Sequence, residues 1–270
     1  MNIDIFITCY KPDREWAAML LRSIKKNLTG YRDIVLVYAG EWREMVLPLK
    51  LSFACYDLNP RLFVVPEREP GHNNQQFLKM TADRFVRGGC DWICQIDSDC
   101  FFERPTSTDE LFVEGKPIWH YGDWKDRDRW RKGSESVLGN PIPHHMMSRM
   151  GMCFRPRDLR LFRGHVIRQQ EEPEGIEFDD IIFDSWDYTS AWAYPLRDGH
   201  MRVRGEPTVS EYHMMGGYMW AARHDTYHWV RSAPRAAWPN PEEPGAFVRQ
   251  YWSHSGLTAE IRAEMEEKLV

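Results

Sequence analysis

Residues 92–102 read Trp-Ile-Cys-Gln-Ile-Asp-Ser-Asp-Cys-Phe-Phe, an apolar run that is interrupted by two acids and then resumes. The first five residues have the length and apolar character of a buried strand. Asp97 and Asp99 therefore stand at the carboxyl end of that strand, two positions apart. In open α/β sheets, ligands bind at this edge. The stretch predicts a strand of an α/β sheet with an acidic site at its end.

The sequence before this stretch alternates strand and helix signals. Short apolar runs and apolar residues at helical spacing predict, in order, elements at 3–8 (strand), 13–27 (helix), 34–38 (strand), 62–65 (strand) and 73–86 (helix). We expect Asn73 to cap the last of these and Gly88-Gly89 to end it. This β-α-β alternation predicts an α/β fold with a mostly parallel sheet flanked by helices.

The second half of the sequence is less regular. We expect a strand at 118–121, helices at 158–167, 178–192 and 258–269, and irregular chain at 140–143, 171–175 and 233–244. Gly216-Gly217 either forms a turn or lets the backbone approach a ligand closely.

Composition excludes several classes of protein. A net charge of -5 over 270 residues argues against a global basic field for nucleic acid, although 26 of the 35 basic residues are Arg and a local arginine-lined groove stays open. The six Cys form no C-x-x-C pair and no zinc spacing. The chain contains no leader-type start and no apolar run of about 20 residues, so we expect a cytoplasmic protein without a membrane span.

The Asp97–Asp99 pair suits a hard divalent cation, Mn²⁺ or Mg²⁺. Such cations take oxygen ligands from carboxylates and share them with phosphates. Two acids at this spacing repel each other unless a cation or another partner compensates them. The alternative is a pair of solvated turn acids, but the buried strand before them and Phe101-Phe102 after them favour a metal site.

At these residues the sequence resembles the glycosyltransferases of GT-A fold that carry an Asp-x-Asp motif. Ile96–Asp99 with Phe101-Phe102 resembles the motif, and Ile5–Asp13 resembles their opening strand and donor loop. Asn74–Lys79 resembles the helix before the motif, and Ser210–Tyr212 resembles a segment near the acceptor in some bacterial members. The resemblance covers the first 105 residues well and the rest thinly.

The resemblance implies a metal-dependent glycosyltransferase that takes a sugar from a nucleotide sugar, by default a UDP-hexose. Asp99 would bind Mn²⁺ or Mg²⁺ directly, Asp97 would bind through water or hold the donor ribose, and His254 would be a third metal ligand. The implied donor-binding residues are Thr8, Cys9, Tyr10, Gln76, Lys79, Asp97 and Ser98. Simpler alternatives remain for three of these residues, because Tyr10 also suits a core aromatic, Lys79 an exposed helix lysine, and His254 a surface histidine.

The implied organisation is a single GT-A-like domain over residues 1–270. Residues 1–105 would bind the nucleotide sugar, and residues 106–270 would bind the acceptor and supply a C-terminal loop and helix. If the reaction inverts the anomeric centre, a carboxylate must take the acceptor proton. Glu211 and Asp180 are the candidate bases, although acids at a helix start also stabilise the helix without any chemistry. A retaining reaction would need no such base.

The acceptor stays open between a saccharide, a lipid-linked glycan, a protein and a modified base of DNA. Arg127–Arg131, interleaved with Trp124 and Trp130, is the best local candidate for a polyanion, with a solvated loop as the alternative. Two rival functions are a nucleotidyltransferase and a non-catalytic carbohydrate- or partner-binding protein on a transferase fold. The first would be expected to carry a Gly-rich phosphate loop, whereas Thr8–Asp13 contains no Gly.

Overall fold

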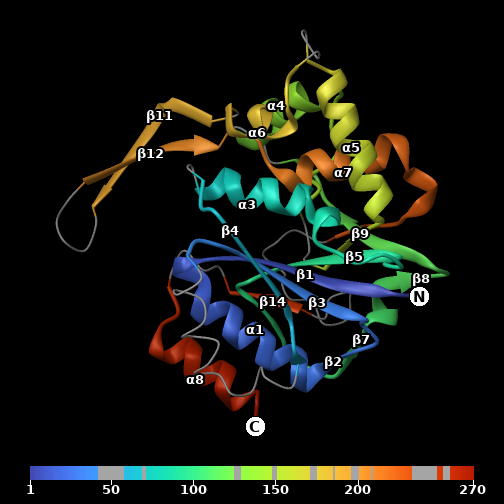
Figure 1. Cartoon of the computed structure of the whole chain (residues 1–270), viewed down its shortest axis with the longest axis vertical. Coiled ribbons are helices and arrows are strands. Elements are labelled where there is room, and N and C mark those ends of the chain that lie inside the picture. The colour runs from blue at the N-terminus through green and yellow to red at the C-terminus, as the bar shows by residue number, and fades with distance from the viewer. Residues whose placement is uncertain are drawn as a thin grey trace.

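The computed structural model describes residues 1–41, 58–68, 71–124, 129–147, 151–170, 175–184, 186–195, 201–207, 209–232, 248–251 and 256–270. Figure 1 shows a central sheet with helices on both of its faces. The prediction of a mixed α/β fold with a mostly parallel sheet flanked by helices is therefore confirmed.

The central sheet has five strands in the order β10-β5-β1-β3-β4. Their bounds are β1 (Ile3–Tyr10), β3 (Asp33–Ala39), β4 (Arg61–Val65), β5 (Trp92–Asp97) and β10 (Met152–Phe154). β1, β3, β4 and β5 are mutually parallel, and β10 runs antiparallel beside β5. In β1 every residue except the last is buried, which explains why its sequence is a nearly continuous apolar run.

Two layers of helices cover this sheet. On one face lie α1 (Arg14–Asn27) and α8 (Ala259–Glu267), and on the other lie α3 (Gly71–Met80), α5 (Pro156–Arg168) and α7 (Glu211–Ala222) (Figure 1). The inner face of α1 buries apolar side chains at helical spacing, which produces the pattern that the sequence shows.

The remaining strands lie outside the central sheet. They are β2 (Leu28–Thr29), β6 (Cys100–Phe102), β7 (Thr106–Ser107), β8 (Phe112–Val113), β9 (Lys116–Tyr121), β11 (Trp186–Pro195), β12 (Met201–Pro207), β13 (His228–Arg231) and β14 (Val248–Gln250). The other helices are α4 (Arg129–Leu138), α6 (Phe178–Asp184) and the 3-10 turns η1 (Lys11–Asp13), η3 (Ala82–Arg84), η4 (Thr108–Leu111) and η5 (His224–Thr226). No helix in the described ranges is long and apolar enough to cross a lipid bilayer.

Two predicted helices differ from the structure. The helix predicted at 73–86 begins at Gly71 and ends at Met80, where the hydroxyl of Thr81 donates to the carbonyl of Phe77 at 2.8 Å. Asn73 is therefore not a cap but an interior residue, and its side-chain amide donates to the carbonyl of Ile182 at 2.8 Å. A helix end that is fixed by tertiary contacts leaves no local signal for the sequence to show.

The helix predicted at 178–192 is wrong beyond Asp184. The chain there becomes the strand β11, which pairs antiparallel with β12. Aromatic and β-branched residues from Trp186 onward favour the strand. The predictions at 171–175 and 233–244 fall wholly or mostly outside the described residues.

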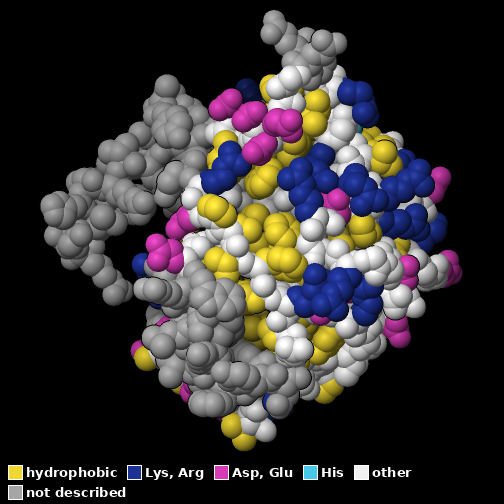
Figure 2. Space-filling model, in the orientation of Figure 1, with side chains coloured by type: hydrophobic (Ala, Val, Ile, Leu, Met, Phe, Trp, Pro, Cys, Tyr) yellow, Lys and Arg dark blue, Asp and Glu magenta, His cyan; other side chains and the backbone are white. Residues whose placement is uncertain are grey.

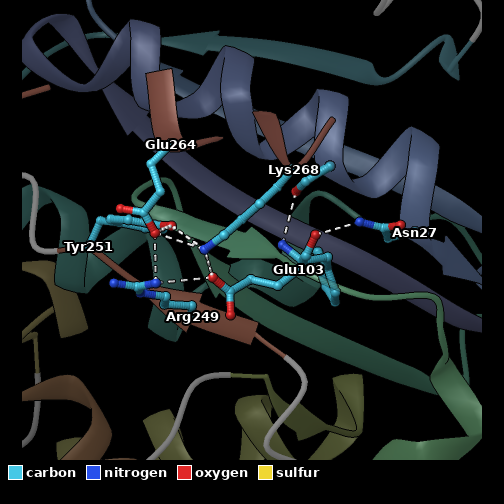
Figure 3. Close-up of polar contacts among 8 residues, drawn as sticks. Asn27, Glu103, Arg249, Tyr251, Glu264 and Lys268 are labelled. Carbon is cyan, nitrogen blue, oxygen red and sulfur yellow. Dashed lines mark hydrogen bonds and ion pairs between the residues drawn. The ribbon is translucent and has the colours of Figure 1, made fainter. Parts of the chain in front are cut away.

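The C-terminal residues are fixed to the sheet by a group of polar side chains, here called the C-terminal clamp: Glu103, Arg249, Tyr251, Glu264 and Lys268 (Figure 3). Glu264 accepts from Arg249 and Lys268, each at 2.8 Å, and from the Tyr251 hydroxyl at 3.1 Å. Glu103, just after β6, accepts from Arg249 at 3.2 Å and also pairs with Lys268. The clamp thus joins α8 to β14, and β14 to the segment that follows β6.

A small apolar core lies beside the clamp. Trp16 and Met19 of α1 pack there with Phe101 of β6 and with the fully buried Met265 of α8. These contacts hold α8 against α1 and keep β14 in antiparallel pairing with β6.

The Gly216-Gly217 pair lies inside α7, so the prediction of a turn is wrong. A Cβ at Gly216 would lie 2.5 Å from the Met146 Cβ and 2.8 Å from the Trp119 Cζ2. A Cβ at Gly217 would lie 2.8 Å from the Ile142 Cγ1. Glycine is needed here because α7 approaches the loop before β10 and the strand β9 closely.

We expect Gly216→Ala to destabilise the protein by about 1–3 kcal/mol, because overpacking outweighs the better helix propensity of alanine. Gly164→Ala in α5 is the matched control, since its Cβ would meet only the end of the Arg168 side chain, at 3.3 Å. Urea denaturation measures both changes. Equal stability of the two variants would contradict the packing described for α7.

The clamp should weaken in acid. The hydrogen bond from Lys268 lowers the pKa of Glu264 below its usual value, against the opposing effect of burial. The stabilisation that ionised Glu264 contributes is therefore fully present above its usual pKa of about 4.5. It is lost as the pH falls through the lower pKa that Glu264 has in the folded protein. We expect amide hydrogen exchange in α8, corrected for its intrinsic pH dependence, to accelerate in that range relative to α5. In Glu264→Gln the exchange should be fast at every pH, and retained protection would contradict the role of the clamp.

Candidate functional site

The carboxyl edge of the central sheet holds the predicted acid pair. β1 and β5 run parallel, and their register places Thr8 beside Asp97. Asp97 ends β5, and Ser98 and Asp99 form the turn that leads into β6. Because both strands end at this edge, the loop after β1 and the acid pair converge there.

Lys79 lies at the centre of a buried polar cluster. Its ammonium, on α3, is 2.6 Å from the Asp97 Oδ1 and 2.8 Å from the Glu211 Oε1 at the start of α7. The Lys79 side chain is only 5% exposed. The carbonyl of Lys79 also accepts a hydrogen bond from the Gln95 side chain of β5 at 2.6 Å. Lys79 is therefore a buried ion-pair partner of two acids, and the alternative of an exposed helix lysine is wrong.

The same cluster determines how these groups ionise. Burial alone would lower the pKa of Lys79, but Asp97 and Glu211 outweigh it and raise that pKa well above its usual value. Tyr212 donates its hydroxyl to the Asp97 Oδ1 at 3.0 Å, and its ring lies 4.6 Å from the Lys79 ammonium. Burial, followed by the charge of Asp97, raises the pKa of Tyr212 well above its usual value, so its phenol stays protonated. One oxygen of Asp97 is thus already bound by two donors.

Gln250 of β14 bridges the two acids of the motif. Its side-chain amide lies 3.3 Å from the Asp97 Oδ2 and 3.2 Å from the Asp99 Oδ1. The backbone N–H of the next residue, Tyr251, donates to the Asp99 carbonyl at 2.9 Å. A neutral amide therefore sits where two carboxylate oxygens converge, which is a position that also suits a cation.

The loop after β1 reaches the same place. Asp13 is buried, and its Oδ2 accepts from the Ser98 hydroxyl at 3.2 Å. The Cys9 thiol is buried, and desolvation raises its pKa, so it stays protonated. Tyr10 is half-buried at the end of β1. Of the predicted donor-binding residues, Ser98 thus contacts the loop that the sequence placed beside the nucleotide.

Several buried polar atoms around α3 have no hydrogen-bond partner within the described part of the chain. They include the Thr8 Oγ1, the Asn74 Nδ2, the Gln76 Oε1 and the Ser210 Oγ. The Gln76 amide nitrogen, by contrast, donates to the Val209 carbonyl at 3.1 Å. An unpaired buried polar group costs about 1–3 kcal/mol, so such atoms are expected where water or a polar ligand binds.

The two candidate bases lie in different surroundings. Glu211 belongs to the polar cluster, as described above. Asp180 is exposed on α6, and its Oδ2 accepts from the backbone N–H of Glu177 at 3.3 Å. Its neighbour Asp179 pairs with Arg68 at 2.8 Å. Among the described residues, Asp180 makes no hydrogen bond or ion pair with the cluster around Lys79.

Other predicted residues fall outside the described ranges or inside the core. His254 lies outside them, as do residues 127–128 of the Arg-rich stretch 127–131. Trp124 donates its indole N–H to the Ile142 carbonyl at 2.8 Å and packs 4.6 Å from the ring of the buried His213. Trp124 therefore contributes to internal packing.

Sequence reasoning missed three members of the cluster. Gln250 had no motif to mark it, and Asp13 and Tyr212 were seen only as parts of longer segments that carry the resemblance. Their roles arise from chain pairing, because Gln250 lies 153 residues from Asp97 in sequence. Only the pairing of β14 with β6 brings these two together.

The residues present fit a divalent cation only if the donor supplies part of its coordination. Among the described residues, no three His, Cys, Asp or Glu side chains form a metal-binding group. Asp97 and Asp99 do converge on the Gln250 amide, and Asp97 shares the buried Lys79 with Glu211. Hard cations often use one or two carboxylates plus substrate phosphates. The converging carboxylate oxygens suit that arrangement.

Comparisons with known proteins give a partial family match and distant structural likenesses. Residues 64–159 match the model of a family of unknown function (DUF6492). No curated protein matches the sequence. Solved structures of similar fold include the galactosyltransferase LgtC in complex with donor and acceptor sugar analogues, which has 13% identity over 66% of this chain and 69% of that one, with a TM-score of 0.43.

Two further structures have the same degree of likeness. An active-site mutant of LgtC has 14% identity over 66% of this chain and 68% of that one, with a TM-score of 0.43. The apo structure of WbbM, a bifunctional glycosyltransferase, has 14% identity over 67% of this chain and 36% of that one, with a TM-score of 0.42. All three TM-scores are below 0.5, so these likenesses are distant.

Proposed function

We propose that this protein is a glycosyltransferase that uses a nucleotide-sugar donor and a divalent cation, with Asp97 and Asp99 at the cation. One observation carries the proposal. Asp99, which is 6% exposed, and Asp97, whose side chain is 13% exposed, stand at the carboxyl edge of the parallel strands, beside the Glu211 carboxylate and buried polar atoms that have no partner among the described residues. The resemblance of Ile5–Asp13 and Ile96–Asp99 to donor-binding segments of GT-A enzymes supports the same function.

The two acids would have different roles. Asp97 Oδ1 is engaged by Lys79 and Tyr212, which leaves its Oδ2 for a cation, for bound water or for the donor ribose. Asp99 would be the direct ligand, with Mn²⁺ or Mg²⁺ completing its shell from the donor diphosphate. When bound, the cation would neutralise charge on the leaving nucleoside diphosphate. His254 stays the proposed further ligand.

Gln250 would have to release the acid pair when a cation binds. Its amide holds Asp97 and Asp99 together by hydrogen bonds of 3.3 and 3.2 Å, which are long enough to exchange for stronger charge-assisted contacts. Meanwhile Lys79 would keep Asp97 and Glu211 in place. Lys79 itself would serve as an internal counter-ion, because its ammonium already pairs with Asp97 and Glu211.

The remaining assignments are also proposals. Residues 1–105 would bind the donor and residues 106–270 the acceptor, within one domain. Thr8, Cys9, Tyr10 and Gln76 would contact the nucleotide, where the unpaired Thr8 and Gln76 oxygens could accept hydrogen bonds from it. UDP is the expected nucleotide by resemblance.

Glu211 is the better of the two proposed bases for an inverting reaction. It belongs to the polar cluster, whereas Asp180 serves the start of its own helix. The Glu211 side chain is 8% exposed, so an acceptor hydroxyl would have to enter the site to reach it. Water would be excluded from the same space, which favours transfer over hydrolysis.

Removing the central counter-ion should destabilise the fold. Lys79→Met leaves Asp97 and Glu211 buried without their cation, so we expect a loss of about 3–5 kcal/mol in the free energy of unfolding. Urea denaturation in EDTA measures this change. Lys132→Met, at an exposed position of α4, is the control and should change stability by less than about 0.5 kcal/mol.

A double variant sharpens this test. Lys79→Met with Glu211→Gln should recover part of the loss, because one of the two unpaired charges is removed. A loss below about 1 kcal/mol for Lys79→Met would contradict the cluster as a buried ion-pair network.

Calorimetric titration with UDP, with and without Mn²⁺, tests the proposed function, with GDP and CDP as controls for the base. We expect Mn²⁺-dependent binding that is selective for UDP and is lost in Asp99→Asn. Asp225→Asn, at an exposed position of η5, should bind as the unchanged protein does.

Product formation then separates the rivals. Release of UDP from a UDP-sugar supports transfer, whereas binding without turnover supports the non-catalytic alternative. Release of pyrophosphate from a nucleoside triphosphate favours a nucleotidyltransferase. Unchanged UDP binding in Asp99→Asn would falsify the metal-site assignment.

A further inference from the structure

The exposed face of α5 carries arginines and no acid. Arg157, Arg160 and Arg168 are all exposed. Arg160 and Arg168 follow Arg157 by three and eleven residues, so all three arginines lie on one side of the helix. The acid of this helix, Asp158, faces inward, is 3% exposed, and accepts from Arg223 at 3.0 Å.

Two further arginines extend this face. Arg84 and Arg87 are exposed in and just after η3, which packs against α5. Arg160 lies 3.6 Å from the carboxylate of Asp83, which joins the two segments. That carboxylate is already bound by the buried Arg163 at 2.5 and 3.0 Å, so it offsets little of the exposed charge.

We define these five residues, Arg84, Arg87, Arg157, Arg160 and Arg168, as the arginine patch. In Figure 2, dark-blue side chains gather on the part of the surface where α5 lies in Figure 1.

The charge of the patch is largely uncompensated. Within the described part of the chain, Arg160 alone of its five members is in an ion pair, and that contact is long. Three arginines elsewhere behave differently: the exposed Arg104 and Arg231 and the half-buried Arg262 each contact a carboxylate at 2.5 to 2.8 Å. Among the described residues, a chain of net charge -5 therefore gathers arginines with few carboxylate partners on one face.

This chemistry fits a surface of phosphate groups. Guanidinium groups bind phosphates with two parallel hydrogen bonds, and several in a row attract an extended anionic surface. Leu161 and Ile167 lie half-buried on the same helix, so apolar side chains flank the arginines. A helix with this combination suits the headgroup region of a bilayer, where phosphates and apolar chains meet. An aromatic side chain, which single-stranded nucleic acid would use for stacking, is missing from the exposed positions of α5.

We propose that the arginine patch docks the protein on an anionic phospholipid surface. The position of the patch agrees with such docking. The carbonyl of Arg87 accepts from Arg32, which lies next to the amino end of β3, whereas Asp97 and Asp99 lie at the carboxyl end of β5. The bound surface would therefore adjoin the edge opposite the acid pair, which leaves the acid pair accessible. This docking does not depend on the proposed reaction.

Sedimentation with lipid vesicles tests the docking. The vesicles are phosphatidylcholine alone, or phosphatidylcholine in which one lipid in three is phosphatidylglycerol. We expect binding only to the anionic vesicles, and weaker binding as salt rises. Replacing Arg84, Arg157 and Arg160 together by Gln should weaken it by about a hundredfold, because each basic side chain near an anionic surface contributes about a factor of five.

The matched control replaces Arg104, Arg131 and Arg262 by Gln. It makes the same change in net charge at one exposed and two half-buried positions, each paired with an acid. This control should bind nearly as the unchanged protein does, and thermal melts check that both variants fold. Equal binding to neutral and anionic vesicles, or an equal loss in the two variants, overturns the proposal. Binding of duplex DNA through the patch, with no vesicle binding, also overturns it.

Discussion

The ammonium of Lys79 joins three distant parts of the chain at one buried point. It pairs with Asp97 at the end of β5 and with Glu211 at the start of α7, while its own backbone lies near the end of α3. In a low-dielectric interior, each of these charges depends on the others, because removal of one leaves its partner buried and uncompensated. The positions of α3 and α7 relative to the sheet edge therefore depend on this contact.

The same contact helps to explain how Asp97 and Asp99 can lie close together in the folded protein. Carboxylates placed close together in a protein interior repel one another and would tend to protonate. Lys79, the hydroxyl of Tyr212 and the amide of Gln250 instead supply donors to them. Two carboxylates that converge on a neutral amide can exchange that amide for a positively charged ligand. This is the physical basis on which the proposed cation site rests.

The sheet could be predicted well because each buried strand is a continuous apolar run in the sequence. β1, β3 and β5 are apolar runs, and the parallel order that follows from β-α-β alternation places Asp97 and Asp99 at the carboxyl edge of these strands. The prediction was poorer for those features that tertiary contacts determine. The end of α3 at Met80 and the strand β11 in place of a longer α6 are set by packing and pairing. The role of Gln250 could not be predicted from the sequence, since it arises from the pairing of β14 with β6.

The lateness of β14 in the sequence has a consequence for synthesis. The parallel strands β1, β3, β4 and β5 and the acid pair all lie within residues 1–99, whereas Gln250 follows Asp97 by 153 residues. A ribosome-bound chain can therefore form the parallel strands early, before the amide that restrains their acids has been made. The growing polypeptide thus passes through a stage in which the acid pair lacks its bridging amide.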